Sequence, residues 1–284
     1  MKRHTAVKSN DSKTTALFKL LQDDNPRIAA LAMEQFLKRE QLLDSLIAEY
    51  QDTSDKRLRQ RLHQLSSILV QRRARRQFVS NVQEQSYSLW HGICRLNQLY
   101  DADCSQKKIA RMTTEICNES DQFLSSATRL ASFMKEADFS VPSRLLMDID
   151  FYLIDSVLEF RIGSSALLCA LAQHVGWRLG RWSSSVVLYE GSYCLVDSQN
   201  LLIDPSHNWK VEKLDKTDRF HPCSRQDVWI GILSQMFLVA LTEGNLPDCH
   251  HLGRLMTELN GDQMDCFPYP LGKRRDADEE RRTD

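Results

Sequence analysis

The chain has 284 residues, of which 42% are hydrophobic, so it can form one large domain or two small ones. Its formal net charge is −1, which argues against a chain built as a whole to hold a polyanion or an acidic membrane. No apolar run approaches the roughly 18 residues that a membrane span needs. The first residues also lack the apolar region of a secretory signal, so secretion is not expected.

The cysteines are scattered along the chain and no two of them form a CxxC pair. This distribution predicts reduced thiols and a cytoplasmic location rather than a disulfide framework or a zinc site. No glycine-rich phosphate loop, HExxH motif or EF-hand pattern is present. We therefore expect neither a cofactor nor a bound metal.

Residues 1 to about 13 are polar and are predicted to be disordered. Helical spacing of apolar residues begins at Ala16, and residues 14–140 are predicted to form a helical amino-terminal region. Within it, Asn25 can cap a helix whose first turn contains Pro26. The stretch Leu-Leu-x-Asp-Asp-x-Pro, followed by an alanine-containing helix, resembles a HEAT-type helical hairpin.

A long helical region is predicted from Asp55 to about Leu99, as two helices broken near residues 79–81. It carries a run of basic residues, namely Arg57, Arg59, Arg61, Arg72, Arg73, Arg75 and Arg76. One interpretation is a surface for nucleic acid. The other is a solvated helix face beside a buried leucine stripe, with arginines that point in several directions and alternate with acidic neighbours. We favour the second because no aromatic residues interleave with the arginines, so a nucleic-acid partner is not expected.

Residues 141–222 are predicted to form a core of one helix and a small antiparallel sheet. The helix extends from about Ser164 to Leu179, and three short apolar runs follow at residues 185–189, 193–196 and 201–203. Turn residues at hairpin spacing separate the runs, which predicts antiparallel strands packed against the helix. Residues 206–210 look like a loop, and residues 216–222 are polar.

Four motifs in this core occur in a characteristic order: Val157-Leu-Glu-Phe-Arg-Ile-Gly163, Arg178-Leu-Gly180, Tyr189-Glu-Gly-Ser-Tyr-Cys-Leu-Val196 and Leu202-Ile-Asp-Pro205. Together they resemble the core of the SirB-type transglutaminase-like proteins of bacteria, within the papain-like and transglutaminase-like superfamily. The resemblance covers about fifty residues. It implies that a nucleophile opens the helix, a histidine lies on the second strand and an acid ends the third.

The catalytic positions implied by this resemblance are degenerate. The nucleophile's position is Ser165, the histidine's position is Ser192, and only the acid, Asp204, is kept. Acyl transfer by this geometry needs an activated nucleophile and a base within hydrogen-bond reach, and a serine cannot act as that base near neutral pH. The resemblance therefore implies a catalytically inactive protein. Asp204 is then expected to accept hydrogen bonds at the turn before Pro205, with no imidazole to orient.

Three arrangements could restore the chemistry. Ser165 could act as nucleophile, although no histidine lies at the expected position beside it. Cys169 could replace it, because positions i and i+4 share a helix face, but a cysteine in Ala-Leu-Leu-Cys-Ala-Leu-Ala is more often core packing. His207, three residues past Asp204, could supply the base from the adjacent loop, although a loop histidine is usually only solvated.

Residues 223–262 are predicted to form a helical hairpin that resembles a tetratricopeptide (TPR) unit. Its first helix includes residues 229–240 and ends near Gly244, and its second extends from Leu246 to Leu259. Residues 273–284 are almost all charged and are predicted to be disordered.

The sequence thus predicts an α+β protein that is mostly α: a helical amino-terminal region, a transglutaminase-like core and a carboxy-terminal hairpin. The expected function is that of a protein-interaction or regulatory module that is not an enzyme and whose protein partner is unknown. Two alternatives stay open. One is a hydrolase or acyltransferase that uses Cys169 or Ser165 with His207, and the other is a nucleic-acid-associated protein that uses the helix with Arg57–Arg76.

Overall fold

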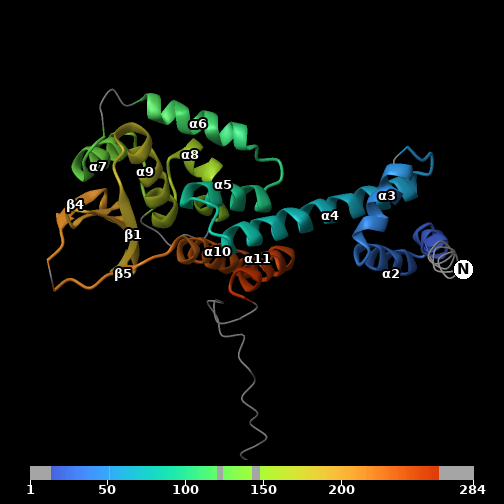
Figure 1. Cartoon of the computed structure of the whole chain (residues 1–284). Helices are drawn as coiled ribbons and strands as arrows, with labels where there is room; N and C mark the ends of the chain where they lie inside the picture. Colours follow the sequence, from blue (N-terminus) through green and yellow to red (C-terminus); the bar gives the residue numbers. More distant parts are fainter. Residues whose placement is uncertain (1–13, 51, 120–123, 143–147, 216, 262–284) are drawn as a thin grey trace, which may run out of the picture. The chain divides into compact units, whose positions relative to one another are not determined.

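The structure is a computed structural model that describes residues 14–50, 52–119, 124–142, 148–215 and 217–261 (Figure 1). It confirms an α+β fold that is mostly α, with one small antiparallel sheet. Residue contacts divide the chain into two compact units, residues 1–77 and 78–284. The segments 1–13 and 273–284, which were predicted to be disordered, lie outside the described residues.

The first unit consists of short helices. One is described from residue 14 to residue 21, and α2 (Pro26–Leu37), α3 (Glu40–Tyr50) and the start of α4 (Lys56–Gln83) follow. Asn25 caps α2 by accepting a hydrogen bond from the Arg27 amide at 3.0 Å, and Pro26 occupies the first turn, as the sequence predicts. Leucines and one phenylalanine from all of these helices form a separate core: Leu21, Phe36, Leu37, Leu43, Leu46, Leu58, Leu62, Leu65 and Leu69.

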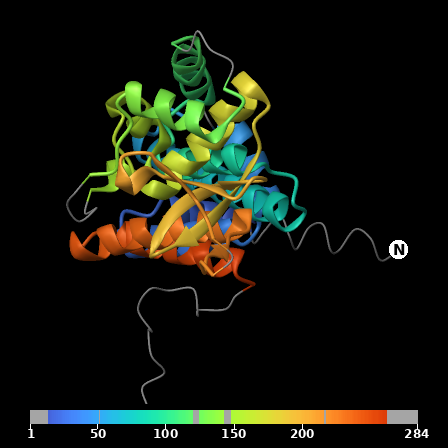
Figure 2. The same ribbon diagram turned by 90° about the vertical axis from the view of Figure 1, so that its left-hand side faces the viewer.

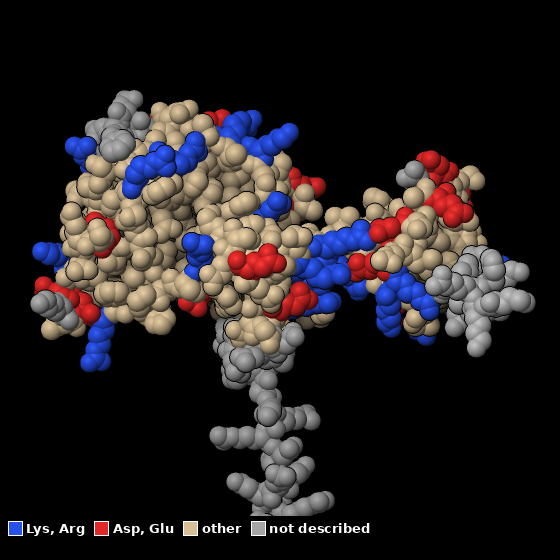
Figure 3. Space-filling view, viewed as in Figure 1, with Lys and Arg blue, Asp and Glu red and all other residues tan. Residues whose placement is uncertain are grey.

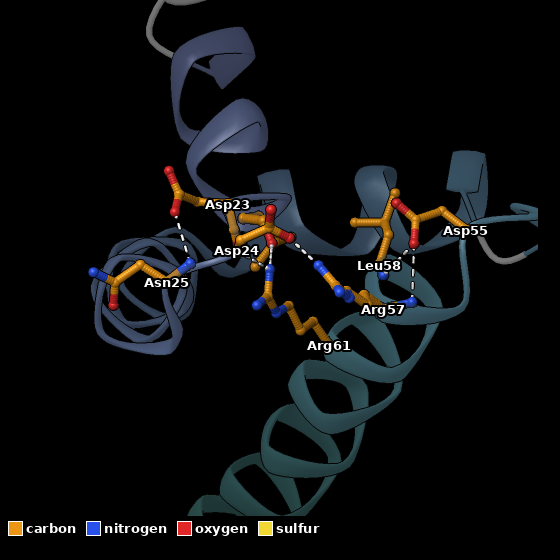
Figure 4. A network of polar contacts seen from close by, with 8 residues as sticks. Asp23, Asp24, Asn25, Asp55, Arg57, Leu58 and Arg61 are labelled. Atoms are coloured by element: carbon orange, nitrogen blue, oxygen red, sulfur yellow. Dashed lines mark hydrogen bonds and ion pairs between the residues drawn. The ribbon is translucent and has the colours of Figure 1, made fainter.

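The arginines of α4 in this unit contact the neighbouring helices. Arg57 pairs with Asp24, and Arg61 donates to the carbonyl oxygens of Leu21 and Asp23, the latter at 2.8 Å (Figure 4). Their partners therefore lie around the cap of α2.

Further along α4 the same pattern continues. Arg73 lies 2.6 Å from a carboxylate oxygen of Asp44, Arg76 pairs with Glu40, and Arg75 is buried. Figure 3 shows basic and acidic side chains side by side along this helix. Arg73 and Arg76 thus have acidic neighbours, as the sequence predicts, whereas Arg72 donates to the Leu37 carbonyl oxygen at 3.4 Å.

The predicted break at residues 79–81 is wrong. α4 continues to Gln83, and the chain turns at residues 84–88 before α5 begins. Asn81 remains helical because its side-chain amide donates to the Tyr87 hydroxyl at 2.5 Å, and the Ser80 hydroxyl donates to Glu84 at 2.9 Å. Serine and asparagine disfavour a helix interior because their side chains compete for nearby backbone groups, and here both side chains bond to other side chains.

The second unit contains the remaining elements. They are α5 (Leu89–Tyr100), α6 (Gln106–Asn118), α7 (Ala127–Glu136), η1 (Ile149–Tyr152), α8 (Ile154–Phe160), α9 (Ser165–Gly180), β1 (Ser184–Tyr189), β2 (Ser192–Asp197), β3 (Leu201–Asp204), η2 (Pro205–His207), β4 (Lys210–Lys213), β5 (His221–Pro222), α10 (Arg225–Thr242) and α11 (Leu246–Leu259). The predicted helix at 164–179, the three predicted strands and both predicted carboxy-terminal helices are confirmed within one or two residues, apart from the start of α10. One hydrophobic core connects α5 to α11. Residues of the three predicted regions, 14–140, 141–222 and 223–262, therefore contribute to one hydrophobic core.

The sheet has the order β4-β3-β2-β1-β5 and every pairing is antiparallel. Val186, Leu195 and Ile203 are register partners in one row and belong to the core with α9, which lies beside the sheet in Figure 1 and Figure 2. The residues between them point to the opposite face, where a smaller cluster forms: Val187, Cys194, Val196, Leu202 and Leu214. Both faces of the sheet are therefore partly buried.

The sequence does not predict strands β4 and β5, because β4 begins at the end of the loop-like stretch 206–210 and β5 lies in the polar segment 216–222. β4 pairs along its whole length with β3 although Lys210 and Lys213 are exposed, as is common for an edge strand. In the turn before it, Asn208 and Trp209 both have positive φ values, 56° and 58°. The Trp209 indole is buried and donates to the Phe139 carbonyl oxygen at 2.6 Å, which holds this turn.

Within the described ranges, none of the helices is both long enough and apolar enough to cross a lipid bilayer.

Candidate functional site

A pocket of about 480 Å³ opens at the amino-terminal end of α9 in the second unit. Its wall comes from the start of α9, the β1–β2 turn, η1, η2 and one face of α10. The lining residues are Val141, Tyr152, Ser164, Ser165, Ala166, Gly191, Ser192, Tyr193, Ser206, Gly231, Ile232, Gln235, Leu238 and Thr242.

The segment before α9 is fixed by Arg161, which lies in the motif that carries the family resemblance. Arg161 has a left-handed backbone conformation (φ 60°) and ends α8. Its guanidinium donates to the Glu119 carboxylate at 2.9 Å and to the Ala137 carbonyl oxygen at 2.8 Å, and it lies over the Phe139 ring. These contacts fix the backbone at Arg161. Ser164, three residues later, is the N-cap residue of α9.

The structure brings together at this pocket two of the three positions to which the resemblance assigns catalytic residues. Ser165 is the first residue of α9, and its hydroxyl accepts a hydrogen bond from the Tyr193 amide at 3.3 Å. Ser192 opens β2 directly before Tyr193. Both serines line the pocket, so the end of the helix and the start of the second strand meet where the resemblance implies catalytic residues.

Asp204 ends β3 and is nearly buried. One of its carboxylate oxygens accepts hydrogen bonds from the amides of Ser206 (2.7 Å) and His207 (3.3 Å), which confirms its predicted role at this turn. The other lies 2.6 Å from Nδ1 of His207. The expectation that Asp204 has no imidazole to orient is therefore wrong: the short η2 helix turns His207 back onto the acid three residues earlier.

His207 nevertheless does not line the pocket. Its side chain is 69% exposed, and among the described residues the pocket wall includes Ser206 but not His207. A serine nucleophile needs the base within hydrogen-bond reach, about 3 Å from its hydroxyl oxygen. Asp204 and His207 form a pair beside the pocket, and Ser165 is paired instead with a backbone amide.

Cys169 lies one helical turn deeper than Ser165 and is completely buried. Its thiol donates to the Tyr193 carbonyl oxygen at 3.3 Å. Burial raises the pKa of this thiol well above its usual value, and the neighbouring Cys194 and Asp204 raise it further. A protonated thiol without solvent access is a poor nucleophile, so the packing interpretation fits Cys169 better.

The described residues of the pocket wall carry no formal charge. Among them only Tyr152 and Tyr193 are ionisable, and burial raises the pKa of both phenols to about 12. A charged ligand group would find no opposite charge on this wall, and an unpaired buried charge is costly. The pocket can instead offer hydroxyl and amide groups together with apolar surface.

The sequence did not predict that residues of α10 line the pocket. Gly231, Gln235, Leu238 and Thr242 follow each other at intervals of four, three and four residues, which places them on one face of α10. A methyl group at Gly231 would lie 2.0 Å from the Tyr193 hydroxyl, so only glycine allows this contact. In the sequence, only the polar residues Gln235 and Thr242 between apolar residues of α10 could have indicated that this face lines a pocket.

Within the described part of the chain, no group of three or more His, Cys, Asp or Glu side chains could hold a metal ion. The seven cysteines among those residues are all free thiols. Comparison of the chain with protein-family models, with curated proteins and with solved structures gives no match.

Proposed function

We propose that this chain is a transglutaminase-like protein of the SirB type that has lost acyl-transfer chemistry and acts as a protein-interaction or regulatory module. The supporting observation is the composition of the pocket at the vestigial triad. Ser165 and Ser192 line it together with other hydroxyl groups, and its described wall contains no thiol, imidazole or carboxylate. A site of this kind can bind a ligand without activating a nucleophile.

The cytoplasmic location is part of the same proposal, because seven free thiols persist where they are not oxidised. The unknown partner is expected to be a protein. The arginines of α4 support this choice over nucleic acid, since Arg57, Arg61, Arg73 and Arg76 already contact oxygen atoms within the first unit.

A second candidate function is supported by one observation, the contact of 2.6 Å between His207 and Asp204. A carboxylate that orients an imidazole is the arrangement by which a serine hydrolase prepares its base. A rotation of the exposed His207 side chain toward Ser165 would be needed for this activity. We rank it second because Ser165 has a backbone partner and His207 is not on the pocket wall.

The two candidates are separated by covalent labelling of the purified full chain. A fluorophosphonate probe reports an activated serine and a chloroacetamide probe reports an accessible thiol, and the modified residue is identified by peptide mass spectrometry. We expect no labelling of Ser165 or Cys169, and the variants Ser165→Ala and Cys169→Ala should match the parent. Partly exposed Cys223 is an internal control for the thiol probe. Stoichiometric labelling that Ser165→Ala or His207→Ala abolishes would establish the hydrolase instead.

A further inference from the structure

A strip of exposed basic side chains crosses α6 and the carboxy-terminal half of α9. Lys107, Arg111 and Thr114 are exposed and share one face of α6, because they are spaced by four and three residues. Arg178 of α9 lies 3.5 Å from the Thr114 hydroxyl, which joins the exposed faces of the two helices. We call Lys107, Arg111, Trp177, Arg178 and Arg181 the α6–α9 strip.

The strip carries a local excess of positive charge. Three described acidic side chains on or beside α6 are already engaged: Glu115 pairs with Arg111, Glu119 with Arg161, and Glu159 with Lys108. In the parts of the chain that the structure describes, no ion pair involves Lys107, Arg178 or Arg181. Arg111 pairs only at the surface, where such a pair is weak and easily exchanged.

An aromatic ring lies within this basic surface. Trp177 is 50% exposed, and the Arg181 guanidinium lies 5.0 Å from the centroid of its ring. An exposed tryptophan flanked by arginines combines the residue types that most often dominate protein–protein interfaces. The ring also adds an apolar contact that a purely electrostatic surface would lack.

We propose that the α6–α9 strip binds an acidic peptide segment of a partner protein. Carboxylates of the segment pair with Lys107, Arg178 and Arg181, and an apolar side chain between them packs on Trp177. A nucleic acid fits less well, because its binding depends mainly on the number of phosphates that basic side chains neutralise, and among the described residues the strip offers three cations without an ion pair. The proposal uses a surface other than the pocket and goes beyond the function proposed above.

This inference is tested by titrating the purified full chain into a fluorescently labelled peptide and measuring the fluorescence anisotropy of the peptide. The peptide consists of glutamate and glycine with one leucine. We expect this peptide to bind at least about tenfold more tightly than the same peptide with glutamine in place of glutamate. The double variant Arg178→Glu, Arg181→Glu should lose at least about tenfold in affinity, and Trp177→Ala should lose several-fold. Raising the salt concentration should weaken binding, because exposed charges are screened.

Arg59→Glu is the matched control, since Arg59 is an exposed arginine of the first unit outside the strip. It should leave the affinity unchanged. Far-UV circular dichroism verifies that the double variant is folded, and Lys107→Glu replaces it if it is not.

The proposal is overturned if the glutamine peptide binds equally well, if the strip variants bind like the parent, or if a single-stranded oligonucleotide binds more tightly than the acidic peptide. Strip-dependent self-association in sedimentation experiments would assign the surface to a second copy of the chain and would also overturn it. Labelling of Ser165 is a separate measurement, so failure of the proposed function and failure of this inference are distinguishable.

Discussion

The two units of this protein treat charge in opposite ways. In the first, the arginines of α4 are matched by carboxylates and carbonyl oxygens of α2 and α3, so a conspicuous run of charge is used to assemble helices. In the second, the pocket at the start of α9 has a described wall of hydroxyl, amide and apolar groups. A charged run is easy to see in a sequence, whereas a pocket lined by uncharged residues is not.

The stability of each unit can be measured separately, because the two units have different spectroscopic signals. All five tryptophans, Trp90, Trp177, Trp182, Trp209 and Trp229, belong to the second unit. Tryptophan fluorescence during denaturant unfolding therefore reports the second unit, while far-UV circular dichroism follows the helices of both. Each variant below can be assigned to one unit in this way.

The largest effect is expected for Gly180→Ala, at the end of α9. A methyl group there would lie 1.8 Å from the Leu124 carbonyl oxygen, which belongs to the backbone and cannot rotate away. We expect the free energy of unfolding of the second unit to fall by about 3 kcal/mol. Gly244→Ala is the control: it has a positive φ but open space around it, and should cost about 1 kcal/mol. Equal costs for the two variants would contradict the close approach at Gly180.

The next effect concerns pH. His174 stacks on Trp90 at a centroid distance of 4.6 Å, and burial, assisted by Arg178, lowers the pKa of His174 to about 4 from an ordinary value of 6.5. Between these values the unfolded chain binds a proton that the folded chain does not, so stability falls as the pH decreases from 6.5 toward 4. The total loss is about 3 kcal/mol, because one pKa unit corresponds to about 1.4 kcal/mol.

His174→Phe keeps the ring on Trp90 and removes the titration. The difference in unfolding free energy between this variant and the parent should be constant above neutral pH and should change by about 3 kcal/mol on acidification, in favour of the variant. A difference that does not vary with pH would show that His174 does not carry this dependence.

A smaller loss is expected for Arg161→Ala. The guanidinium of Arg161 is partly buried and has carboxylate, carbonyl and aromatic partners, so its removal should cost the second unit about 2 kcal/mol. Arg161→Lys should recover only part of this, because an ammonium cannot reproduce the planar set of donors. Full recovery by lysine would mean that only the charge matters.

The smallest effect belongs to the first unit. Arg73→Ala removes contacts with Asp44 and Glu40, but the arginine side chain is 46% exposed. Such pairs contribute about 0.2 to 1 kcal/mol, so circular dichroism should detect a loss below 1 kcal/mol and tryptophan fluorescence no change. A loss as large as that of Arg161→Ala would remove the contrast between the two units.

Much of the fold could be predicted from local signals. Asn25 and Pro26 mark the start of α2, and the apolar runs and turn residues near Val186 and Leu195 give strands β1 to β3. The polar edge strand β4 could not be predicted, because its place depends on pairing with β3 and not on its own residues.

At the candidate site, the sequence locates Ser165, Ser192 and Asp204, but other parts depend on tertiary packing. The hydrogen bond of His207 to Asp204 requires the short turn of η2, which no residue pattern showed. The contribution of α10 was missed because Gln235 and Thr242 look like ordinary surface residues until the helix is placed beside β2. Uncharged residues form no sequence motif that indicates a site, so a pocket lined by them is recognised only from the folded structure.

The left-handed turn at Asn208 and Trp209 has a consequence for the order of folding. Two successive non-glycine residues with positive φ are unfavourable by themselves, and the indole of Trp209 is held by the Phe139 carbonyl oxygen, seventy residues earlier in the chain. The hairpin from β3 to β4 therefore cannot be a stable nucleus and should close only after the chain around Phe139 has docked. In kinetic terms, a substitution at Trp209 should accelerate unfolding far more than it slows refolding.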